Sequence, residues 1–586
     1  MPAVKESSAR EAAATQPATA RVVAILACIL AFVDYLRAFG FGFVFDDHDQ
    51  IQFNGAIQSW SHFGSLFTHH VWAFNDPNFG GNYWRPLFLV WLLINHTLFA
   101  LKPAGWHIAS VLLHVAVTWL VYRVALRLAR DAWTAAFAAL LFAVNPIHIE
   151  AVTWVSGATD SLMALFCLGS LLCWFRYRDD KQSIWLAASL MLYAGAMLSK
   201  ETGIVLVAIV AIAAFLFPPA ASARGDKLRW TMGATAPFAA VMVVYLACRQ
   251  LALRGMAHPL GGESLGAMVL TWPSMLWFYA RQLLLPVGLS GFYDVAVVDS
   301  IGVMNVLVPL LALAAIAAGI VYWSRRAGQP MIAFCAGWIL IGLLPVLYIR
   351  VFPSWDIVHD RYLYLPSVAF VILVAYAIRQ IKSAKESFGI PKTQLVVVAA
   401  IAVLYCASGI VDQGAWATDY TLYRRGFAVA PNNLTPKVDL AIIMVRNQQD
   451  APRAAELLRE ALAKSPDLYE ANYNLGYLYF VSGAYRDAET FLTRSISTRP
   501  WEAPQYAYRS ISRMRLGELD AAAEDARHAL ELTPDAKRFH YAYGLILEKQ
   551  GHPDQAAAEF EAELKKYPGD PTVEEALARV QQHGGR

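Results

Sequence analysis

The sequence has 586 residues, of which 57% are hydrophobic and only 16% are charged. Soluble domains contain roughly 25% charged residues, so this composition excludes a cytosolic multidomain enzyme, a disordered chain and a collagen-like chain. It indicates a protein that crosses a membrane many times. The net charge of +3 adds little, because the side of the membrane on which Lys and Arg fall is more informative than their sum.

Apolar runs long enough to cross a hydrocarbon layer of about 30 Å recur from Val22 to about Val411 and then end. The polar, Ala-rich segment that precedes them is expected to be disordered. The run 22–44 lacks a small-residue cleavage site before Phe45, so we expect an uncleaved first span and not a signal peptide. The predicted parts are a disordered cytoplasmic N-terminus (1–21), a membrane domain (22–411) and a soluble C-terminal domain (412–586).

The membrane domain is predicted to be all-helical. The expected spans number about eleven, at 22–44, 106–127, 133–146, 158–175, 184–199, 202–217, 230–251, 301–323, 331–349, 363–381 and 395–411. Two further apolar stretches, 86–101 and 267–287, are ambiguous because periodicity alone does not separate a span from a surface helix.

Charge separates the two possibilities for these stretches. If both lie on the membrane surface, the basic clusters Arg123–Arg130, Arg176–Lys181, Arg325–Arg326 and Lys382–Lys392 all fall on one side, which the positive-inside rule identifies as the cytoplasm. An odd number of spans then places the N-terminus in the cytoplasm and residues 412–586 outside it.

The C-terminal domain is predicted to be a repeat array. Pro466, Pro500, Pro534 and Pro568 are each 34 residues apart, which is the tetratricopeptide period. Each proline ends the second helix of a pair because it has no N–H to continue the helix. About four stacked repeats form an α-solenoid with a concave surface that can bind an extended peptide or a partner helix. Candidates for that surface, if they are not ordinary packing or solvated positions, are Tyr469, Tyr473, Asn474, Tyr506, Arg509, Arg513 and His540.

Four charged segments lie beside spans, and the predicted topology places all of them on the outer side. They are Phe45–Asp49 with the later Arg85 in the same loop, Asn145–Asp160, Ser199–Gly203 and His359–Pro366. Charges beside a membrane are unfavourable unless they are used. Three carboxylates where a span emerges could supply a general base or hold a metal or a cationic group. The alternative is that they form a solvated loop cluster.

Such carboxylates and isolated cations at the hydrocarbon border fit a lipid-linked phosphate. Apolar spans can hold an isoprenoid tail, Arg361 and Lys200 can pair with its phosphate, and Asp46 or Asp47 can take a proton from an acceptor hydroxyl. The sequence contains no Walker-type glycine loop or Rossmann fingerprint, which argues against a soluble nucleotide donor. No nucleic-acid partner is expected. Asp46, Asp47, His48 and His148 could bind a divalent metal, but their spacing is not diagnostic.

The motifs FDDHDQI, NYWRPL, NPIHIEAVTWVSGATD, SKETG and DRYLYLPS, followed by the repeats, resemble the transmembrane and tetratricopeptide repeat-containing protein family. This family belongs to the C-type glycosyltransferase superfamily, and the resemblance covers nearly the whole chain. It implies a helical membrane domain with additional surface helices and inverting transfer of mannose from a dolichyl- or polyprenyl-phosphate donor to Ser or Thr of proteins. The repeats are then expected to hold the protein or peptide acceptor.

The resemblance also implies residue roles. The acidic pair Asp46-Asp47 contains the catalytic base, and Asp160 is the second acidic position. The family's Gly-Arg-Ala-Asp pattern is Gly-Ala-Thr-Asp here, so the phosphate contact of its missing arginine passes to Arg85 or Arg361. The expected catalytic residues are Asp46, Asp47 and Asp160, and the expected substrate- or donor-binding residues are Arg85, His148, Glu150, Lys200, Glu201, Arg361 and Tyr362.

Three alternatives remain at this point. The charged corners could be span-end anchors, with Asp360–Arg361 and Lys200–Glu201 neutralising each other locally. The chain could be a membrane scaffold, although an anchor needs only one span. A transporter would need ionisable groups within the bilayer, and Asp34 and Arg37 in the first span are expected to neutralise each other.

The expected location is a bacterial inner membrane with periplasmic repeats, because the loops are short and a retention signal is missing. The equivalent place in a eukaryote is the lumen of the endoplasmic reticulum.

Overall fold

The computed structural model describes residues 2–74, 81–219, 227–255, 258 and 262–584. The described residues are almost entirely helical, and their only strands are the two-residue β1 (Glu386–Ser387) and β2 (Ile390–Pro391), which form an antiparallel hairpin. The predicted all-α fold class is confirmed.

The chain forms two compact units, residues 1–433 and residues 434–586. The border predicted from the sequence lies between 411 and 412, whereas residues 412–433 cluster with the first unit. This segment contains helix α15 (Asp419–Val429), which packs on the loops of the first unit as described below.

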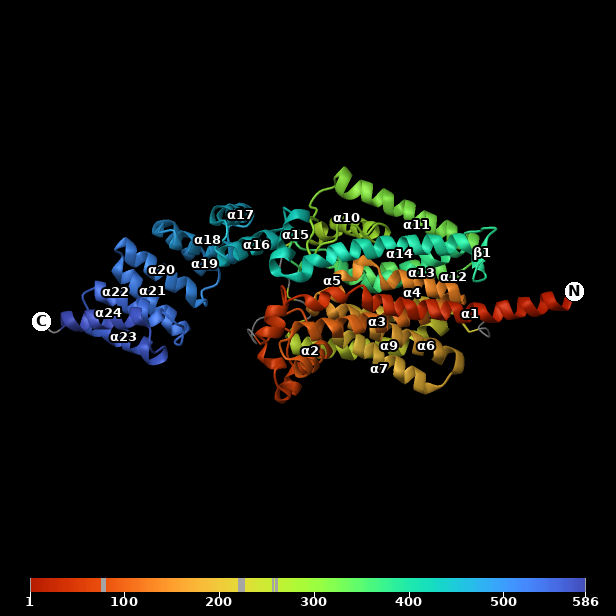
Figure 1. Ribbon diagram of the computed structural model, residues 1–586, viewed down its shortest axis with the longest axis horizontal. Helices are drawn as coiled ribbons and strands as arrows, with labels where there is room; N and C mark the ends of the chain where they lie inside the picture. Colours follow the sequence, from red (N-terminus) through yellow and green to blue (C-terminus); the bar gives the residue numbers. More distant parts are fainter. Residues whose placement is uncertain (1, 75–80, 220–226, 256–257, 259–261, 585–586) are drawn as a thin grey trace. The chain divides into compact units, whose positions relative to one another are not determined.

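The first unit is built from helices, most of which are long, apolar and side by side (Figure 1). They are α1 (Pro2–Val33), α2 (Pro86–Phe99), α3 (Pro103–Ala129), α4 (Ala132–Ala143), α5 (Ile149–Thr153), α6 (Ala158–Asp180), α7 (Ser183–Ser199), α8 (Leu206–Leu216), α9 (Lys227–Leu253), α10 (Leu265–Leu284), α11 (Val308–Ala327), α12 (Pro330–Leu343), α13 (Tyr364–Arg379) and α14 (Lys392–Gln413). Helix α1 includes the N-terminal segment for which the sequence predicts disorder.

Among the described helices, eight are long and apolar enough to cross a membrane, or nine if the bent pair Ala132–Ala143 and Pro146–Thr153 is one span. The remaining two predicted spans, 184–199 and 202–217, coincide with the shorter apolar helices Ser183–Ser199 and Glu201–Leu216. The ambiguous stretches form α2 and α10, and neither of them is among the eight.

Small and hydroxyl residues bring these helices close together, as is typical of membrane bundles. Helix α4 is Ala-rich and buried along nearly its whole length. Between α6 and α7, the Ser170 hydroxyl donates to the Ser189 carbonyl at 2.7 Å, and the Ser189 hydroxyl donates back to the Ser170 carbonyl at 2.8 Å.

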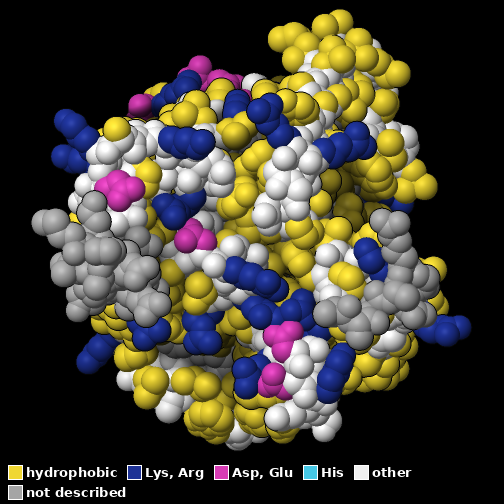
Figure 2. Space-filling model, turned by 90° about the vertical axis from the view of Figure 1, so that its right-hand side faces the viewer, with side chains coloured by type: hydrophobic (Ala, Val, Ile, Leu, Met, Phe, Trp, Pro, Cys, Tyr) yellow, Lys and Arg dark blue, Asp and Glu magenta, His cyan; other side chains and the backbone are white. Residues whose placement is uncertain are grey.

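The two ends of the bundle differ in composition. The hairpin β1–β2 lies at one end, while α2, α5 and α15 lie toward the other (Figure 1). Figure 2 views the hairpin end, where Lys and Arg side chains are more prominent than Asp and Glu. Arginines occupy the last turns of several helices, namely Arg127 in α3, Arg178 in α6, Arg325 and Arg326 in α11, and Arg379 in α13.

The second unit is a tetratricopeptide array, as predicted. Its helices are α16 (Leu434–Arg446), α17 (Ala451–Lys464), α18 (Tyr469–Val481), α19 (Tyr485–Thr498), α20 (Ala503–Leu516), α21 (Leu519–Leu532), α22 (Phe539–Lys549), α23 (Pro553–Lys566) and α24 (Pro571–Gly584). A Cβ added at Gly476 would lie 2.8 Å from Cγ of Leu492, and one at Gly544 would lie 2.5 Å from Cε1 of Phe560. Glycine at these positions therefore permits the close approach of paired helices.

The predicted concave-surface residues do not all face solvent. Arg509 is buried and forms a bidentate ion pair with Asp525 at 2.8 and 2.7 Å. Tyr506 is also buried, and its hydroxyl donates to the Pro500 carbonyl at 3.0 Å. These two residues pack between helices, whereas Tyr469 and Tyr473 are half-buried and stack on each other with ring centroids 5.9 Å apart.

Candidate functional site

The acidic pair after α1 divides into two unlike residues. Asp47 is fully buried, and its Oδ1 accepts from the backbone N–H and the hydroxyl of Ser156 at 2.9 and 2.6 Å. Its Oδ2 accepts from Val44 N–H at 3.3 Å. Among the described residues, no side chain hydrogen-bonds the Asp46 carboxylate, which lies in the wall of a cavity. Asp47 therefore ties the loop to Ser156 while Asp46 stays available for chemistry.

This cavity has a volume of about 250 Å³ and contains most of the predicted site residues. Its wall includes Asp46, Arg85, Lys200, Glu201, Arg361 and Tyr362, together with Tyr83, Trp154, Ser156 and Arg249. Four of these side chains are cationic, so the cavity suits an anionic group such as a phosphate.

Three of the cations are paired with carboxylates from distant segments. Arg85 binds Glu201 through two hydrogen bonds of 2.8 and 2.6 Å. Lys200 donates to Asp160 at 2.6 Å, and both side chains are about 3% exposed.

The third cation is Arg361. Its guanidinium is paired with Glu150, which also accepts from the Arg361 backbone N–H at 2.9 Å. Each of these cations therefore pairs with a carboxylate from another segment. The alternative, in which Asp360–Arg361 and Lys200–Glu201 neutralise each other locally, does not describe this site.

Aromatic rings form another part of the wall and stack on the cations. The Arg85 guanidinium lies 4.4 Å from the Tyr83 ring centroid, and that of Arg361 lies 5.2 Å from the Trp154 ring. Lys200 and Arg361 each lie 5.1 Å from the ring of Tyr362. Tyr362 therefore contacts both cations through its ring.

Glycines let these segments approach each other. A Cβ on Gly157 would lie 2.5 Å from the Glu150 carbonyl oxygen, so only glycine allows the turn that follows α5 to fold back on it. A Cβ on Gly203 would lie 2.9 Å from the backbone of Ala196, which brings the Lys200-Glu201 corner down onto α7.

Burial gives both acidic residues raised pKa values. Burial raises the pKa of Asp46 to about 7, and the nearby positive charge of Arg361 limits the rise. Burial also raises the pKa of Asp47 to about 6, against the opposing effect of the hydrogen bonds from Ser156. A carboxylate with a pKa near 7 is suited to proton transfer at neutral pH.

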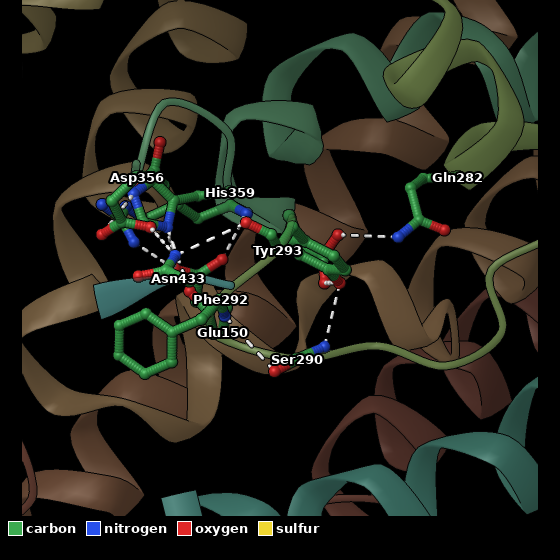
Figure 3. A network of polar contacts seen from close by, with 12 residues as sticks. Glu150, Gln282, Ser290, Phe292, Tyr293, Asp356, His359 and Asn433 are labelled. Carbon is green, nitrogen blue, oxygen red and sulfur yellow. Dashed lines mark hydrogen bonds and ion pairs between the residues drawn. The ribbon is translucent and has the colours of Figure 1, made fainter. Parts of the chain in front are cut away.

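A buried polar network includes Glu150, the partner of Arg361 (Figure 3). Nδ1 of His359 lies 3.5 Å from Glu150 and 3.2 Å from the Gly291 carbonyl oxygen, and its Nε2 lies 3.8 Å from Asp356. Asn433 donates to Asp356 at 3.2 Å. Burial lowers the pKa of His359 well below its usual range, so the ring is neutral. His359 and Arg361 therefore both contact Oε1 of Glu150.

The same network includes Asp360, whose carboxylate accepts from the Tyr293 hydroxyl and, at 3.4 Å, from the Gln282 amide. Asp360 therefore faces away from Arg361, its neighbour in the sequence.

His148 lies outside the cavity, contrary to its expected role on the acceptor side. Its Nε2 lies 2.8 Å from the Ser367 hydroxyl, and its ring packs 4.2 Å from that of Phe142 and 4.7 Å from that of Tyr364. The short turn at Pro146–His148 directs this side chain into the helical core while Glu150 reaches Arg361.

The possible metal donors do not converge. His48 is hydrogen-bonded to Asp419 and Gln52, Asp47 to Ser156, and His148 to Ser367. In the part of the chain that the structure describes, no group of three or more His, Cys, Asp or Glu side chains could hold a metal ion. Asp34 and Arg37 also do not pair as expected, since Arg37 donates to the Ile410 carbonyl at 3.1 Å and Asp34 hydrogen-bonds Cys406.

A second, apolar cavity of about 600 Å³ lies between α10, α11, α12 and α13. Its wall includes Leu276, Leu283, Ile316, Ile320, Ile339, Leu340, Leu343, Phe370 and Leu373. Leu343 ends α12, and the residues that follow it, Pro345 and Val346, line the polar cavity. One turn of chain therefore takes part in both walls.

Comparisons with known proteins agree with both units. Residues 85–247 match the family described as dolichyl-phosphate-mannose-protein mannosyltransferase, and residues 446–508 and 509–571 each match a tetratricopeptide repeat family. The protein O-mannosyl-transferase TMTC3 of Homo sapiens is 25% identical over 567 residues, which cover 88% of this chain and 61% of that protein. The protein O-mannosyl-transferase Tmtc2 of Drosophila melanogaster is 34% identical over 214 residues, which cover 35% of this chain and 22% of that protein.

The matches in both parts of the chain agree with its resemblance to the transmembrane and tetratricopeptide repeat-containing protein family.

The chain spans about three fifths of the length of the first curated relatives that it matches. Among solved structures, a crystal structure of MamA is 24% identical with a TM-score of 0.24, covering 25% of this chain and 86% of that one. A crystal structure of YrrB, titled as a tetratricopeptide protein with an unusual peptide-binding site, is 16% identical with a TM-score of 0.26, covering 28% of this chain and 84% of that one.

Several residues of the candidate site could not be predicted from the sequence. Tyr293, Asp356 and Asn433 join the network through tertiary contacts. Each lies in a loop or a segment without an apolar run beside it, so the local sequence does not mark it as a site residue. Arg249 lines the cavity from within the span α9 and donates to the Asn82 carbonyl at 2.8 Å. Its place inside an apolar span was the one signal that could have drawn attention to it.

Proposed function

We propose that this protein is an integral-membrane glycosyltransferase that moves mannose from a polyprenyl-phosphate donor to Ser or Thr hydroxyls of proteins. One observation carries the proposal. The carboxylate of Asp46, with its pKa near 7, lines the same cavity as Arg85, Lys200, Arg361 and Arg249. A base and a cationic group opposite it are what transfer of a sugar from a phosphate to a hydroxyl requires.

In the proposed reaction Asp46 takes the proton of the acceptor hydroxyl. The hydroxyl oxygen forms a bond to the anomeric carbon of the sugar while the bond from that carbon to the phosphate oxygen breaks. The electron pair leaves with the phosphate, whose charge is stabilised by Arg361, Lys200 and Arg85. A single displacement inverts the configuration at the anomeric carbon.

Glu150, Asp160 and Glu201 act through the cations in this mechanism. Each holds one cation in place by an ion pair. Their charges also limit the net positive charge of the cavity, so the anionic product is not held too tightly to leave. Asp47 positions the base by fixing its loop to Ser156.

The apolar cavity supports a lipid-linked donor. It lies between the candidate spans α11, α12 and α13 and the helix α10, and it shares the end of α12 with the polar cavity. An isoprenoid chain in the apolar cavity would place its phosphate toward the cations. The repeats would bring the acceptor protein to the same side of the membrane.

The location that fits this proposal has the Asp46 cavity and the repeats on the extracytoplasmic side, in a bacterium the periplasmic side of the inner membrane. The supporting observation is the basic hairpin end of the bundle (Figure 2), which by the positive-inside rule faces the cytoplasm.

The experiment uses the full-length protein purified in detergent, radiolabelled polyprenyl-phosphate mannose and a Ser/Thr-containing peptide. We expect mannosyl peptide from the wild-type protein and about 10²- to 10⁴-fold less from Asp46→Asn. Asp49→Asn is the matched control, because Asp49 is an exposed acidic residue of the same loop. A wild-type protein that neither transfers the sugar nor binds the lipid donor would instead be a membrane scaffold for its repeats.

A further inference from the structure

The segment that closes the first unit packs on the loop of the acidic pair. Gly42 N–H donates to the Ala417 carbonyl at 3.2 Å, just before α15 begins. Tyr423 of α15 lies 6.4 Å from the ring of Phe45 and 6.0 Å from that of Phe292. Residues 414–429 therefore pack on the loop that carries Asp46.

Asp419 is the polar contact of this segment with the loop. Its Oδ1 accepts from Phe45 N–H at 2.9 Å, and its Oδ2 lies 2.7 Å from Nε2 of His48. One carboxylate thus bridges the residues on both sides of the Asp46-Asp47 pair. Asp419 is the first residue of α15, where the unpaired N–H groups of the helix start favour a negative charge.

Phe45 needs such support because its backbone has a φ of +54°. This left-handed conformation is unfavourable for a residue with a side chain and persists only where the surroundings fix it. Asp419 holds the N–H of Phe45, while Trp154, Phe292 and Tyr423 surround its ring at centroid distances of 5.6, 5.8 and 6.4 Å.

The side chain of Asp46 depends on this backbone. Within the described residues its carboxylate has no hydrogen-bonding partner, so its position is set by the turn at Phe45 and by the anchor of Asp47 to Ser156. A displacement of about 1 Å can cost roughly 10²-fold in rate. A residue that fixes the turn therefore controls where the base points.

We propose that Asp419 is a positioning residue that fixes the Phe45–His48 turn and thereby aims Asp46 into the cavity. The inference rests on the proposed function for its effect on transfer, and on the geometry alone for its effect on the loop.

The test compares Asp419→Ala, Asp419→Asn and the control Asp412→Asn in the full-length protein. Asp412 lies in the same segment and pairs with Arg425 at 3.0 Å, but it does not bind the acidic loop. We expect Asp419→Ala to lower kcat by about 10- to 100-fold, with the donor KM changed less than about threefold. Asp419→Asn keeps an oxygen for Phe45 N–H and should recover most of kcat. Asp412→Asn should stay near the wild type.

A second measurement does not depend on activity. Hydrogen exchange read by mass spectrometry should increase in the peptide covering residues 44–53 of Asp419→Ala, and not in a peptide covering 196–206 or in Asp412→Asn. A wild-type kcat in Asp419→Ala, or a kcat loss of equal size in Asp412→Asn, would overturn the inference. If the wild-type protein transfers no mannose, the proposed function fails and exchange alone decides. Unchanged exchange at 44–53 then overturns the role of Asp419, and increased exchange supports it.

Discussion

Lys200 forms its ion pair with Asp160, 40 residues earlier in the chain, and not with Glu201 beside it. Glu201 binds Arg85 instead. The two pairs join three segments around one cavity, so each charge serves both the fold and the site.

Removing one partner of the Lys200–Asp160 pair should destabilise the protein more than removing both partners. Lys200→Met leaves a buried carboxylate without a partner, which costs about 3–5 kcal/mol, while Lys200→Met with Asp160→Asn removes both charges. We expect thermal unfolding in detergent to show a large loss for the single variant and a substantial recovery for the double one. Mannosyl transfer should stay low in both variants. If the loss of stability in the double variant equalled the sum of the losses caused by the two single substitutions, the two charges would not be coupled.

Transfer should depend on pH through Asp46. The base acts only when ionised, and burial raises its pKa to about 7. The rate of transfer should therefore rise between about pH 6 and pH 8 and level off above, with a roughly tenfold fall per unit well below the pKa. Initial rates with saturating donor measure this dependence. The residual rate of Asp46→Asn should lack this rise between about pH 6 and pH 8. A wild-type profile that is flat over this range would remove Asp46 from the role of base.

Asp46→Asn should stabilise the protein against heat while it inactivates it. The folded-state pKa of Asp46 is raised above its usual value of 3.8, so between about pH 4 and pH 7 the folded state binds more protons than the unfolded state, and stability falls as pH rises. The wild type carries the full penalty at pH 8 and a smaller one at pH 5. The Tm of the variant should exceed that of the wild type at pH 8, and the gap should narrow at pH 5. An equal gap at both values would argue against this cause.

Arg361→Lys should weaken donor binding although it keeps the charge. Lysine cannot reproduce the planar stack on Trp154 and Tyr362 or the guanidinium contact to Glu150. Loss of a charge-assisted hydrogen bond is worth about 1.5–3 kcal/mol, so we expect the donor KM to rise about tenfold or more. Arg281→Lys is the control, since Arg281 is exposed on α10 and does not line the cavity.

A membrane fragment ending at 433 should be active on a short peptide, whereas one ending at 411 should not. Residues 412–433 supply Asp419 and Asn433 to the first unit, and a short peptide does not need the repeats. Transfer assays on both purified fragments, each checked for folding by its near-ultraviolet circular dichroism, measure the difference. Equal activity would show that these residues serve only as a linker.

The fold of each unit could be predicted because its pattern is local. Prolines at a 34-residue spacing identify the repeats, and long apolar runs identify the spans. The border could not be predicted in the same way. Helix α15 has the amphipathic pattern of a soluble helix, and only its contacts through Tyr423 and Asp419 assign it to the first unit.

The site was predicted where a charge stands beside an apolar run, as for Asp46, Arg85 and Arg361. It was missed where the partner lies far away in the chain, as for Asp419, which is 374 residues from Phe45. Residue type was misleading at His148, because the chemistry of an imidazole says nothing about the side of a short turn on which it lies.

The Arg361–Glu150 pair constrains the order in which the protein is assembled. Its partners are 211 residues apart, and synthesis at about 5–20 residues per second separates them by roughly 10–40 s. During that interval Glu150 has left the ribosome and its arginine does not yet exist. The cellular insertion machinery must therefore accommodate an acidic side chain at the mouth of the early helices until the later ones arrive, and the cavity that Arg361 lines is completed late in biogenesis.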